Sequence, residues 1–100
     1  MSSPLDVHRE QIATIDKQIV FWLAQRCEIT DQIGMYKAHN NITVRDEARE
    51  AAVLENVEQY SKFIGGKDES FSKFTPMLFE AIMAYSRSRQ SKFIKVTFKV

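Results

Sequence analysis

Apolar residues recur at helical spacing along the first third of the chain. Residues 5–38 contain no proline and one glycine. Within them, apolar side chains three, four or seven positions apart occur at Leu5, Ile12, Ile15, Ile19, Trp22, Leu23, Ile29 and Ile33. This spacing predicts one long helix, because it places these side chains on a single helical face. The letters S-P-L-D at residues 3–6 are typical of a helix start, and H-N-N at 39–41 indicates its end.

A second helix is expected to begin near Thr43. The letters T-V-R-D offer a capping hydroxyl with an acid three residues later, and apolar residues continue at helical spacing to about Phe63. The two glycines at 65–66 then end the helix, because glycine adopts the backbone angles of a helix C-terminus at low cost.

A third helix is expected from a start between Phe71 and Thr75 to about Lys92. Pro76 favours a start at Thr75, which would give the proline the first helical position, although an earlier start with a tight first turn stays open. Residues 96–100, V-T-F-K-V, alternate like a strand but have no partner strand. We therefore expect residues 95–100 to form an extended or disordered tail.

The length of the first helix indicates a second subunit. At about 1.5 Å per residue it would run for roughly 50 Å, whereas a compact domain of 100 residues has a radius of gyration of about 13 Å. One chain cannot cover such a helix. We therefore expect an all-α fold: a three-helix subunit with one long N-terminal helix, along which a second subunit lies.

Composition narrows the class of protein. With 44% hydrophobic and 27% charged residues, the 100-residue chain should fold as one domain over 1–100. Fourteen Lys+Arg against 13 Asp+Glu give a net charge of +1, so neither nucleic acid nor a membrane surface is an expected partner. The longest apolar run, Ile19 to Ala24, is too short to span a bilayer. The single Cys27 and a start without a secretory pattern favour the cytoplasm.

Three cations lie on the helical face that ought to be apolar. Arg9, Arg26 and Lys37 fall in register with the apolar stripe of the first helix. An unpaired buried cation costs several kcal/mol to desolvate, so anionic groups are expected to meet them. A structural alternative is that Arg9 and Lys37 reach solvent at the two ends, while Arg26 pairs with an internal acid such as Asp31 or Glu50.

The second and third helices carry further polar residues at the edge of their apolar faces. Asp46, Arg49 and Glu50 project from neighbouring turns, and Ser86 and Gln90 are one turn apart on the face that holds the apolar residues of the third helix. Buried polar groups need partners. A surface salt-bridge cluster and a satisfied polar core would each produce the same pattern, and each group taken alone favours a structural role over a functional one.

Taken together, these side chains suit a small polycarboxylate. No nucleophile with an activating base and no glycine-rich phosphate loop is evident, and no metal site is expected within one chain, because the two histidines lie at opposite ends of the first helix. A pocket formed by these side chains would act on its ligand by positioning and electrostatics. Arg9 is 17 residues from Arg26, or about 26 Å along a helix, so Arg9 must serve the pocket of a second copy.

The ordered motifs resemble those of the all-helical chorismate mutases. They are R-x-x-I-x-x-I-D at 9–16, L-A-Q-R at 23–26, I-G-M-Y-K at 33–37, V-R-D-E-A-R-E at 44–50 and L-F-E-A-I-M-A-Y-S-R-S-R-Q at 78–90. The resemblance covers about residues 5–94. It implies an intertwined dimer of three-helix subunits that converts chorismate to prephenate, the committed step toward phenylalanine and tyrosine, without a cofactor.

The resemblance also implies a role for each candidate residue. Arg26 and Arg9 of the second copy would bind the two substrate carboxylates, and Lys37 and Gln90 would grip the ether oxygen. The remaining polar and apolar residues would complete the pocket: Glu50 as acceptor of the ring hydroxyl with help from Asp46, Arg49 and Ser86 in the polar shell with Ser86 near the ring carboxylate, and Ile33, Val53 and Met83 as apolar walls.

Three other functions stay open from the sequence. An isochorismate pyruvate lyase on the same scaffold is disfavoured because such lyases lack acids like Asp46 and Glu50. A mutase of 4-amino-4-deoxychorismate is poorly separated, since these acids could accept a hydrogen bond from a ring amine or a ring hydroxyl. A non-catalytic helical dimerisation module would pair its inward cations internally, so that Arg26→Ala would disturb folding.

Overall fold

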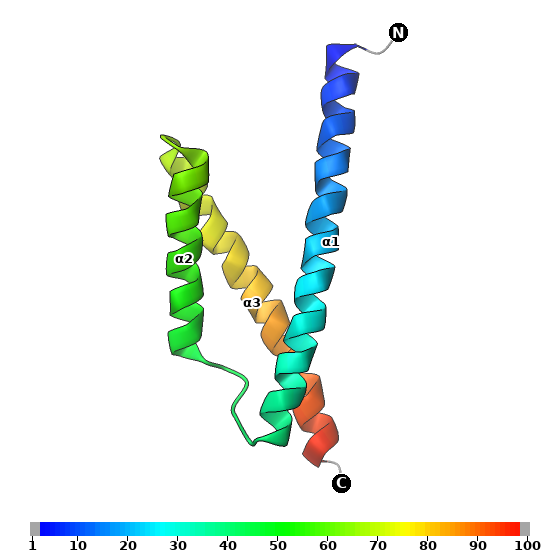
Figure 1. The fold of residues 1–100 in the computed structure, drawn as a ribbon, viewed down its shortest axis with the longest axis vertical. Coiled ribbons are helices and arrows are strands. Elements are labelled where there is room, and N and C mark those ends of the chain that lie inside the picture. The colour runs from blue at the N-terminus through cyan, green and yellow to red at the C-terminus, as the bar shows by residue number, and fades with distance from the viewer. Residues whose placement is uncertain (1–2, 99–100) are drawn as a thin grey trace.

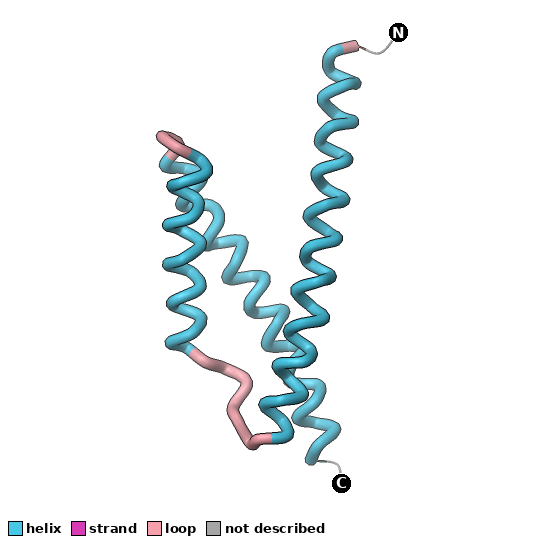
Figure 2. The backbone as a smooth tube through the Cα atoms, viewed as in Figure 1, coloured by secondary structure: helices cyan, strands magenta, loops and turns pink. Residues whose placement is uncertain are grey.

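Three helices form the chain. The computed structural model describes the backbone of residues 3–98 and the side chains of residues 3–94. Helices α1 (Pro4–His39), α2 (Glu47–Gly65) and α3 (Glu69–Phe98) follow one another. Two loops join them, at 40–46 and 66–68 (Figure 2). The described residues contain no strand, and the prediction of an all-α chain with a long first helix is confirmed.

Helix α1 begins and ends within one residue of the predicted bounds. The Ser3 hydroxyl accepts from the backbone N–H of Asp6 at 3.1 Å, and the Asp6 carboxylate accepts from the N–H of Ser3 at 3.4 Å. This reciprocal capping satisfies two N–H groups that have no partner inside the helix. At the C-terminus, Asn40 N–H donates to the Tyr36 carbonyl at 3.1 Å, and Asn41 adopts the left-handed conformation with φ 54°.

Helix α2 begins later than predicted. Its cap is Asp46, whose carboxylate accepts from the N–H of Arg49 at 2.9 Å. Thr43, the expected cap, lies in the loop, where its hydroxyl contacts the Arg45 carbonyl at 3.5 Å. A carboxylate is the stronger cap here, because it also interacts with the positive end of the helix dipole. Residues 43–46 thereby become a linker that passes close to the end of α1.

Helix α3 begins at Glu69 and passes through Pro76, so the predicted start between Phe71 and Thr75 is wrong. A proline removes one backbone hydrogen bond from a helix, a cost that a 30-residue helix packed against α2 can tolerate. The contact between the two helices includes a hydrogen bond of 2.5 Å between the hydroxyls of Ser61 and Thr75. Tertiary packing therefore overrides the local signal of the proline.

The extended tail expected over 95–100 is also wrong over 95–98, because α3 continues to Phe98. A strand of four or five residues needs a neighbouring strand for its backbone hydrogen bonds, whereas a helix supplies these bonds within itself. The last part of the predicted tail, 99–100, lies outside the described residues.

Helix α3 holds the subunit together. It packs against both α1 and α2, while no Cα atom in the described part of α1 lies within 8 Å of one in α2 (Figure 1). A bidentate ion pair joins α3 to α1: Arg89 donates to the two Asp31 carboxylate oxygens at 2.9 and 2.6 Å. These hydrogen bonds lower the pKa of Asp31 below its ordinary value, against the opposing effect of partial burial.

Helices α1 and α3 lie close together at Gly34. A Cβ placed on this buried glycine would lie 2.9 Å from the Gln90 Cα and 2.9 Å from a ring carbon of Phe93. Both distances are shorter than any normal contact between carbon atoms. Only glycine therefore allows α3 to lie so near to α1, and this contact sets the position of Gln90.

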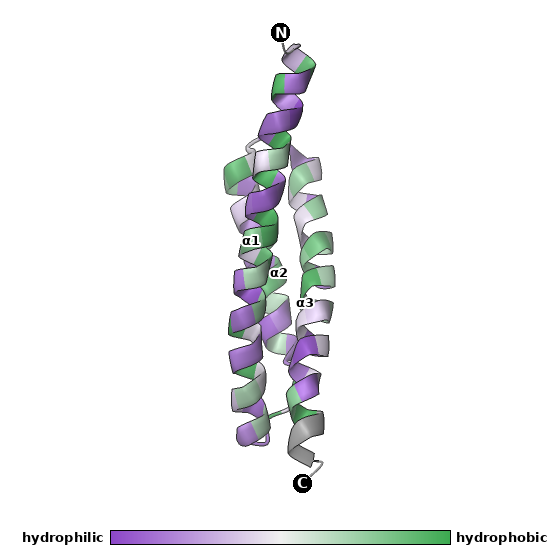
Figure 3. Cartoon of the chain, turned by 90° about the vertical axis from the view of Figure 1, so that its right-hand side faces the viewer, coloured by the Kyte–Doolittle hydropathy of each residue, from purple (hydrophilic) through white to green (hydrophobic). Residues whose placement is uncertain are grey.

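A single chain leaves most of its apolar surface uncovered. Met83 is the one buried hydrophobic side chain among the described residues, and every apolar residue of the predicted α1 stripe is exposed. The chain measures 62 × 32 × 14 Å and exposes 8196 Å², whereas a compact monomer of this mass exposes about 5800 Å². The N-terminal turns of α1 extend beyond the other helices, and hydrophobic positions recur along the free side of α1 (Figure 3).

Candidate functional site

A hollow of about 250 Å³ lies where the three helices and the α1–α2 loop come together. The site residues predicted from the sequence line it, with the exception of Arg9: Arg26, Ile33, Lys37, Asp46, Arg49, Glu50, Val53, Met83, Ser86 and Gln90. Its other lining residues are Thr30, Val44 and Arg87. The fold thus brings positions from three helices into one concave surface of a size suited to a small ligand.

Three of the cations that line the hollow have no acidic partner among the described residues. Arg26 donates to the Ser86 hydroxyl, which in turn donates to the Ile82 carbonyl at 3.0 Å. The Lys37 ammonium donates to the Val44 carbonyl at 2.6 Å. No carboxylate within the described part of the chain forms an ion pair with Arg26, Lys37 or Arg49, so each retains free N–H donors.

The structural alternative for Arg26 is wrong. The two acids that could have paired with it, Asp31 and Glu50, are each occupied by another arginine of α3. Asp31 binds Arg89 outside the hollow, and Glu50 binds Arg87 inside it at 2.5 Å. The guanidinium of Arg26 is therefore held in place by a neutral hydroxyl, an arrangement that leaves its charge available to a ligand.

The two acids of the hollow have different local roles. Asp46 caps α2 through the Arg49 N–H, and this fixes the first turn, from which Arg49 and Glu50 project. Glu50 accepts from Arg87 through one carboxylate oxygen only. Its second oxygen has no hydrogen-bond partner among the described residues and can accept one from a ligand.

Gln90 brings an amide into the hollow from α3. Its side-chain oxygen is buried and has no hydrogen-bond partner within the described residues. An orphaned buried acceptor is costly, and rotation of the amide about its last torsion can exchange this oxygen for the N–H₂ donor. Gln90 can therefore present either an acceptor or a donor to a bound molecule. Apolar walls face it from Ile33, Val53 and Met83.

Sequence reasoning missed three lining residues. Thr30 lies one turn after Arg26, and Arg87 lies one turn after Met83, so helical spacing could have found both. Val44 lies in the loop, where no periodic signal exists. Only the path of residues 40–46 across the end of α1 brings its carbonyl to Lys37.

Arg9 lies apart from the hollow. It is exposed on the N-terminal part of α1, about 26 Å from Arg26 along the helix axis. Within one chain, it cannot contact a small molecule bound beside Arg26. The place of Arg9 in the site of a second copy therefore stays a prediction.

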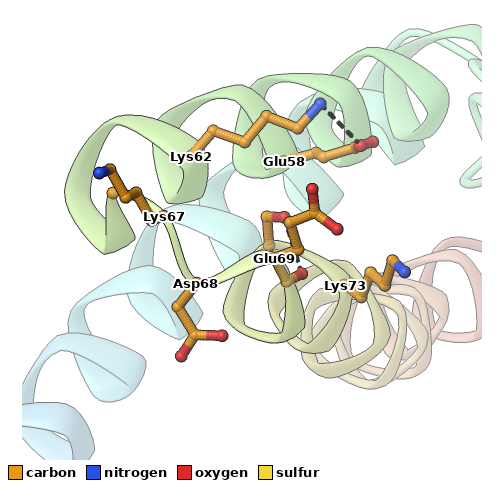
Figure 4. Close-up of a pocket in the computed structure, with 8 residues that line it drawn as sticks. Glu58, Lys62, Lys67, Asp68, Glu69 and Lys73 are labelled. Carbon is orange, nitrogen blue, oxygen red and sulfur yellow. Dashed lines mark hydrogen bonds and ion pairs between the residues drawn. The ribbon is translucent and has the colours of Figure 1, made fainter.

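A second hollow, of about 590 Å³, lies at the turn between α2 and α3 (Figure 4). It is lined by three lysines and three acids, of which Lys62 and Glu58 pair at 3.3 Å with largely exposed side chains. Asp68 points away from Lys62, and hydrogen bonds from Ser70 lower the pKa of its carboxyl. With balanced charges and no arginine, this surface is a poor site for a dicarboxylate.

The described residues lack two other features that would indicate a function. No group of three His, Cys, Asp or Glu side chains is placed to hold a metal ion there. No described helix is long and apolar enough to cross a membrane.

Comparison with known proteins assigns the family. Residues 8–91 match the family chorismate mutase type II. The chain is 33% identical over 94 residues to a bifunctional chorismate mutase/prephenate dehydratase of Buchnera aphidicola subsp. Acyrthosiphon pisum (strain APS), covering 94% of this chain and 23% of that protein. A protein of the same name from Buchnera aphidicola subsp. Baizongia pistaciae (strain Bp) is 32% identical over 95 residues, covering 95% and 24%.

The chain thus spans about a quarter of the length of these curated relatives. No solved structure matches it significantly. The family match covers most of the chain and includes every residue that lines the hollow of about 250 Å³. The chain therefore belongs to the chorismate mutase type II family.

Proposed function

We propose that this chain is a chorismate mutase, which rearranges chorismate to prephenate by positioning and electrostatic stabilisation. The charge of the hollow carries the proposal. Four cationic side chains line it against two carboxylates, and three of the four have no acidic partner among the described residues. Chorismate has two carboxylates, so its charge matches the excess positive charge. Family membership and the activity named for the two relatives support the same substrate.

The two arginines without acidic partners suit carboxylate recognition. A guanidinium binds a carboxylate through two parallel hydrogen bonds, and Arg26 is already oriented for this by Ser86. Ser86 lies next to the ring carboxylate in this arrangement, and Arg49 completes the polar shell. Arg26 and Arg9 of a second copy bind the two substrate carboxylates.

The remaining groups act on the ring and the breaking bond. Lys37 and the amide N–H₂ of Gln90 donate to the ether oxygen, which gains negative charge as the carbon–oxygen bond breaks. The free oxygen of Glu50 accepts from the ring hydroxyl, while Asp46 holds the turn that carries Glu50. The walls formed by Ile33, Val53 and Met83 keep the enolpyruvyl arm folded over the ring.

The rearrangement is intramolecular and needs no acid, base or cofactor. The catalyst must hold a flexible substrate in its compact conformer and stabilise the charge that separates between the two fragments. A charge-assisted hydrogen bond contributes about 1.5 to 3 kcal/mol, and a millionfold acceleration requires about 8 kcal/mol. A few hydrogen bonds that strengthen in the transition state therefore suffice.

We further propose that the active form is an antiparallel homodimer with two shared sites. The exposed apolar face of α1 and the large surface of a single chain support this, because both need a covering partner. A two-fold axis that places two α1 helices antiparallel brings Arg9 of one subunit toward the hollow of the other. The product, prephenate, would enter the synthesis of phenylalanine and tyrosine.

The activity is tested by incubating the purified protein separately with chorismate, isochorismate and 4-amino-4-deoxychorismate and identifying the products. Prephenate formed from chorismate supports the proposal. Pyruvate and salicylate formed from isochorismate would assign the lyase instead, and no product from any of the three would leave a non-catalytic helical module.

The shared site is tested by mixing two inactive variants. Arg9→Ala and Arg26→Ala should each be inactive as homodimers, whereas refolding them together creates heterodimers with one intact site. Random mixing should restore about a quarter of the wild-type activity. Arg45→Ala, which removes an exposed charge, is the control. No recovery in heterodimers of confirmed mass would refute the sharing of Arg9.

A further inference from the structure

Arg87 places an additional cation beside the acid proposed to bind the ring hydroxyl. Its guanidinium donates to a Glu50 carboxylate oxygen at 2.5 Å, and the two side chains are 28% and 20% exposed. Arg87 follows Ser86 and lies one turn after Met83 on α3. All three side chains line the hollow. The resemblance gave this position no role.

The ion pair changes the charge at this end of the hollow. Glu50 is compensated by Arg87, and Asp46 is compensated by the positive end of α2 through the N–H of Arg49. Both carboxylates therefore already have a positive partner before a ligand arrives. The free oxygen of Glu50 can still accept a hydrogen bond, but this end of the site offers no uncompensated negative charge.

We propose that Arg87 is a specificity-determining residue, which makes the site select a neutral hydroxyl over an ammonium group on the substrate ring. The inference rests on the proposed function. A hydroxyl donates one hydrogen bond to the free oxygen of Glu50 and brings no charge. An aliphatic amine is protonated at neutral pH, so it would bring a second cation close to the Arg87 guanidinium, and this like-charge contact disfavours its binding.

The test compares two substrates that differ at this one group, chorismate and 4-amino-4-deoxychorismate. The measured quantity is the ratio of their kcat/KM values for the wild type, Arg87→Met and Arg87→Gln. The glutamine variant keeps a hydrogen-bond donor to Glu50 without the charge, so it preserves the link between α2 and α3 if methionine weakens the fold. Arg87→Lys keeps the charge, and Arg45→Met removes an exposed cation outside the hollow.

The wild type should prefer chorismate by about tenfold or more, and both uncharged variants should reduce this preference by about tenfold, because Glu50 then presents a full negative charge to the ammonium. Arg87→Lys and Arg45→Met should keep the wild-type ratio. A purely structural Arg87 would lower both kcat/KM values together and leave the ratio unchanged, which overturns the inference. A wild type inactive on chorismate would instead overturn the proposed function.

Discussion

Replacing Gly34 with alanine tests the close contact between α1 and α3 at this residue. In an exposed helix interior, this change stabilises by about 1 kcal/mol, because alanine is the better helix former. Here the new methyl group would lie 2.9 Å from the backbone Cα of Gln90 and 2.9 Å from the Phe93 ring. A backbone atom cannot rotate away as a flexible side chain can, so α3 must move as a unit.

The size of this movement follows from the contact distances. Carbon atoms that are not bonded rest about 3.5 to 4.0 Å apart, so relief of the clash moves α3 by about 0.5 to 1 Å away from α1. Overpacking of this kind costs about 1 to 3 kcal/mol, which exceeds the gain in helix propensity. The shift also displaces Gln90 from the hollow, and a misplacement of about 1 Å in a positioned group can cost a factor of about 100 in rate.

We therefore expect Gly34→Ala to lower both the melting temperature and kcat for chorismate, the latter by about 10- to 100-fold. Thermal unfolding and steady-state kinetics measure the two effects. Gly65→Ala is the matched control, because the three atoms nearest to its added methyl group belong to the Phe71 side chain, which does not line the hollow. It should retain wild-type kcat. A Gly34→Ala variant that melts higher and keeps its kcat would refute the reasoning.

Three other side chains, Gln90, Arg26 and Asp31, have roles that can be tested by substitution. The rate of chorismate rearrangement by the wild type should stay nearly flat from about pH 5 to 8, because the Gln90 amide does not titrate. In Gln90→Glu the rate should rise as the pH falls, since a carboxyl group donates a hydrogen bond only when it is protonated. The pH–rate profiles of the wild type and the variant test this difference. Arg26→Ala should lower kcat/KM by about 100-fold or more while the melting temperature changes little, because the one hydrogen-bond partner of Arg26 among the described residues is the Ser86 hydroxyl. A loss of folded protein that accounts for the lost activity would contradict the assignment. Hydrogen bonds from Arg89 lower the pKa of Asp31, so the ionised carboxylate stabilises the fold above its unfolded pKa of about 3.8, and this stabilisation is lost as the pH falls through the lower folded pKa. The difference in melting temperature between the wild type and Asp31→Asn should therefore shrink on acidification. A difference that stays constant with pH would argue against this role of the ion pair.

The helices illustrate which sequence signals are reliable. The start of α1 was predictable because its cap, first-turn proline and acid agree with one another. The start of α3 was not, because Pro76 is a strong local signal against an interior position, and packing against α2 outweighs it. Likewise Thr43 and Asp46 are both capping residues, and the path of the loop decides between them.

Helical spacing by itself determined the all-α class, because the periodic apolar residues predict helices. It also placed several polar side chains on otherwise apolar helix faces, because spacing fixes which residues share a face. It could not determine what each polar side chain would meet. The pairing of Glu50 with Arg87 and of Asp31 with Arg89, and the contact of Lys37 with the Val44 carbonyl, were decided by tertiary structure. These contacts depend on how neighbouring helices are rotated and how far apart they lie. Both quantities arise from packing across the whole subunit, so the spacing of residue types along the chain does not reveal them.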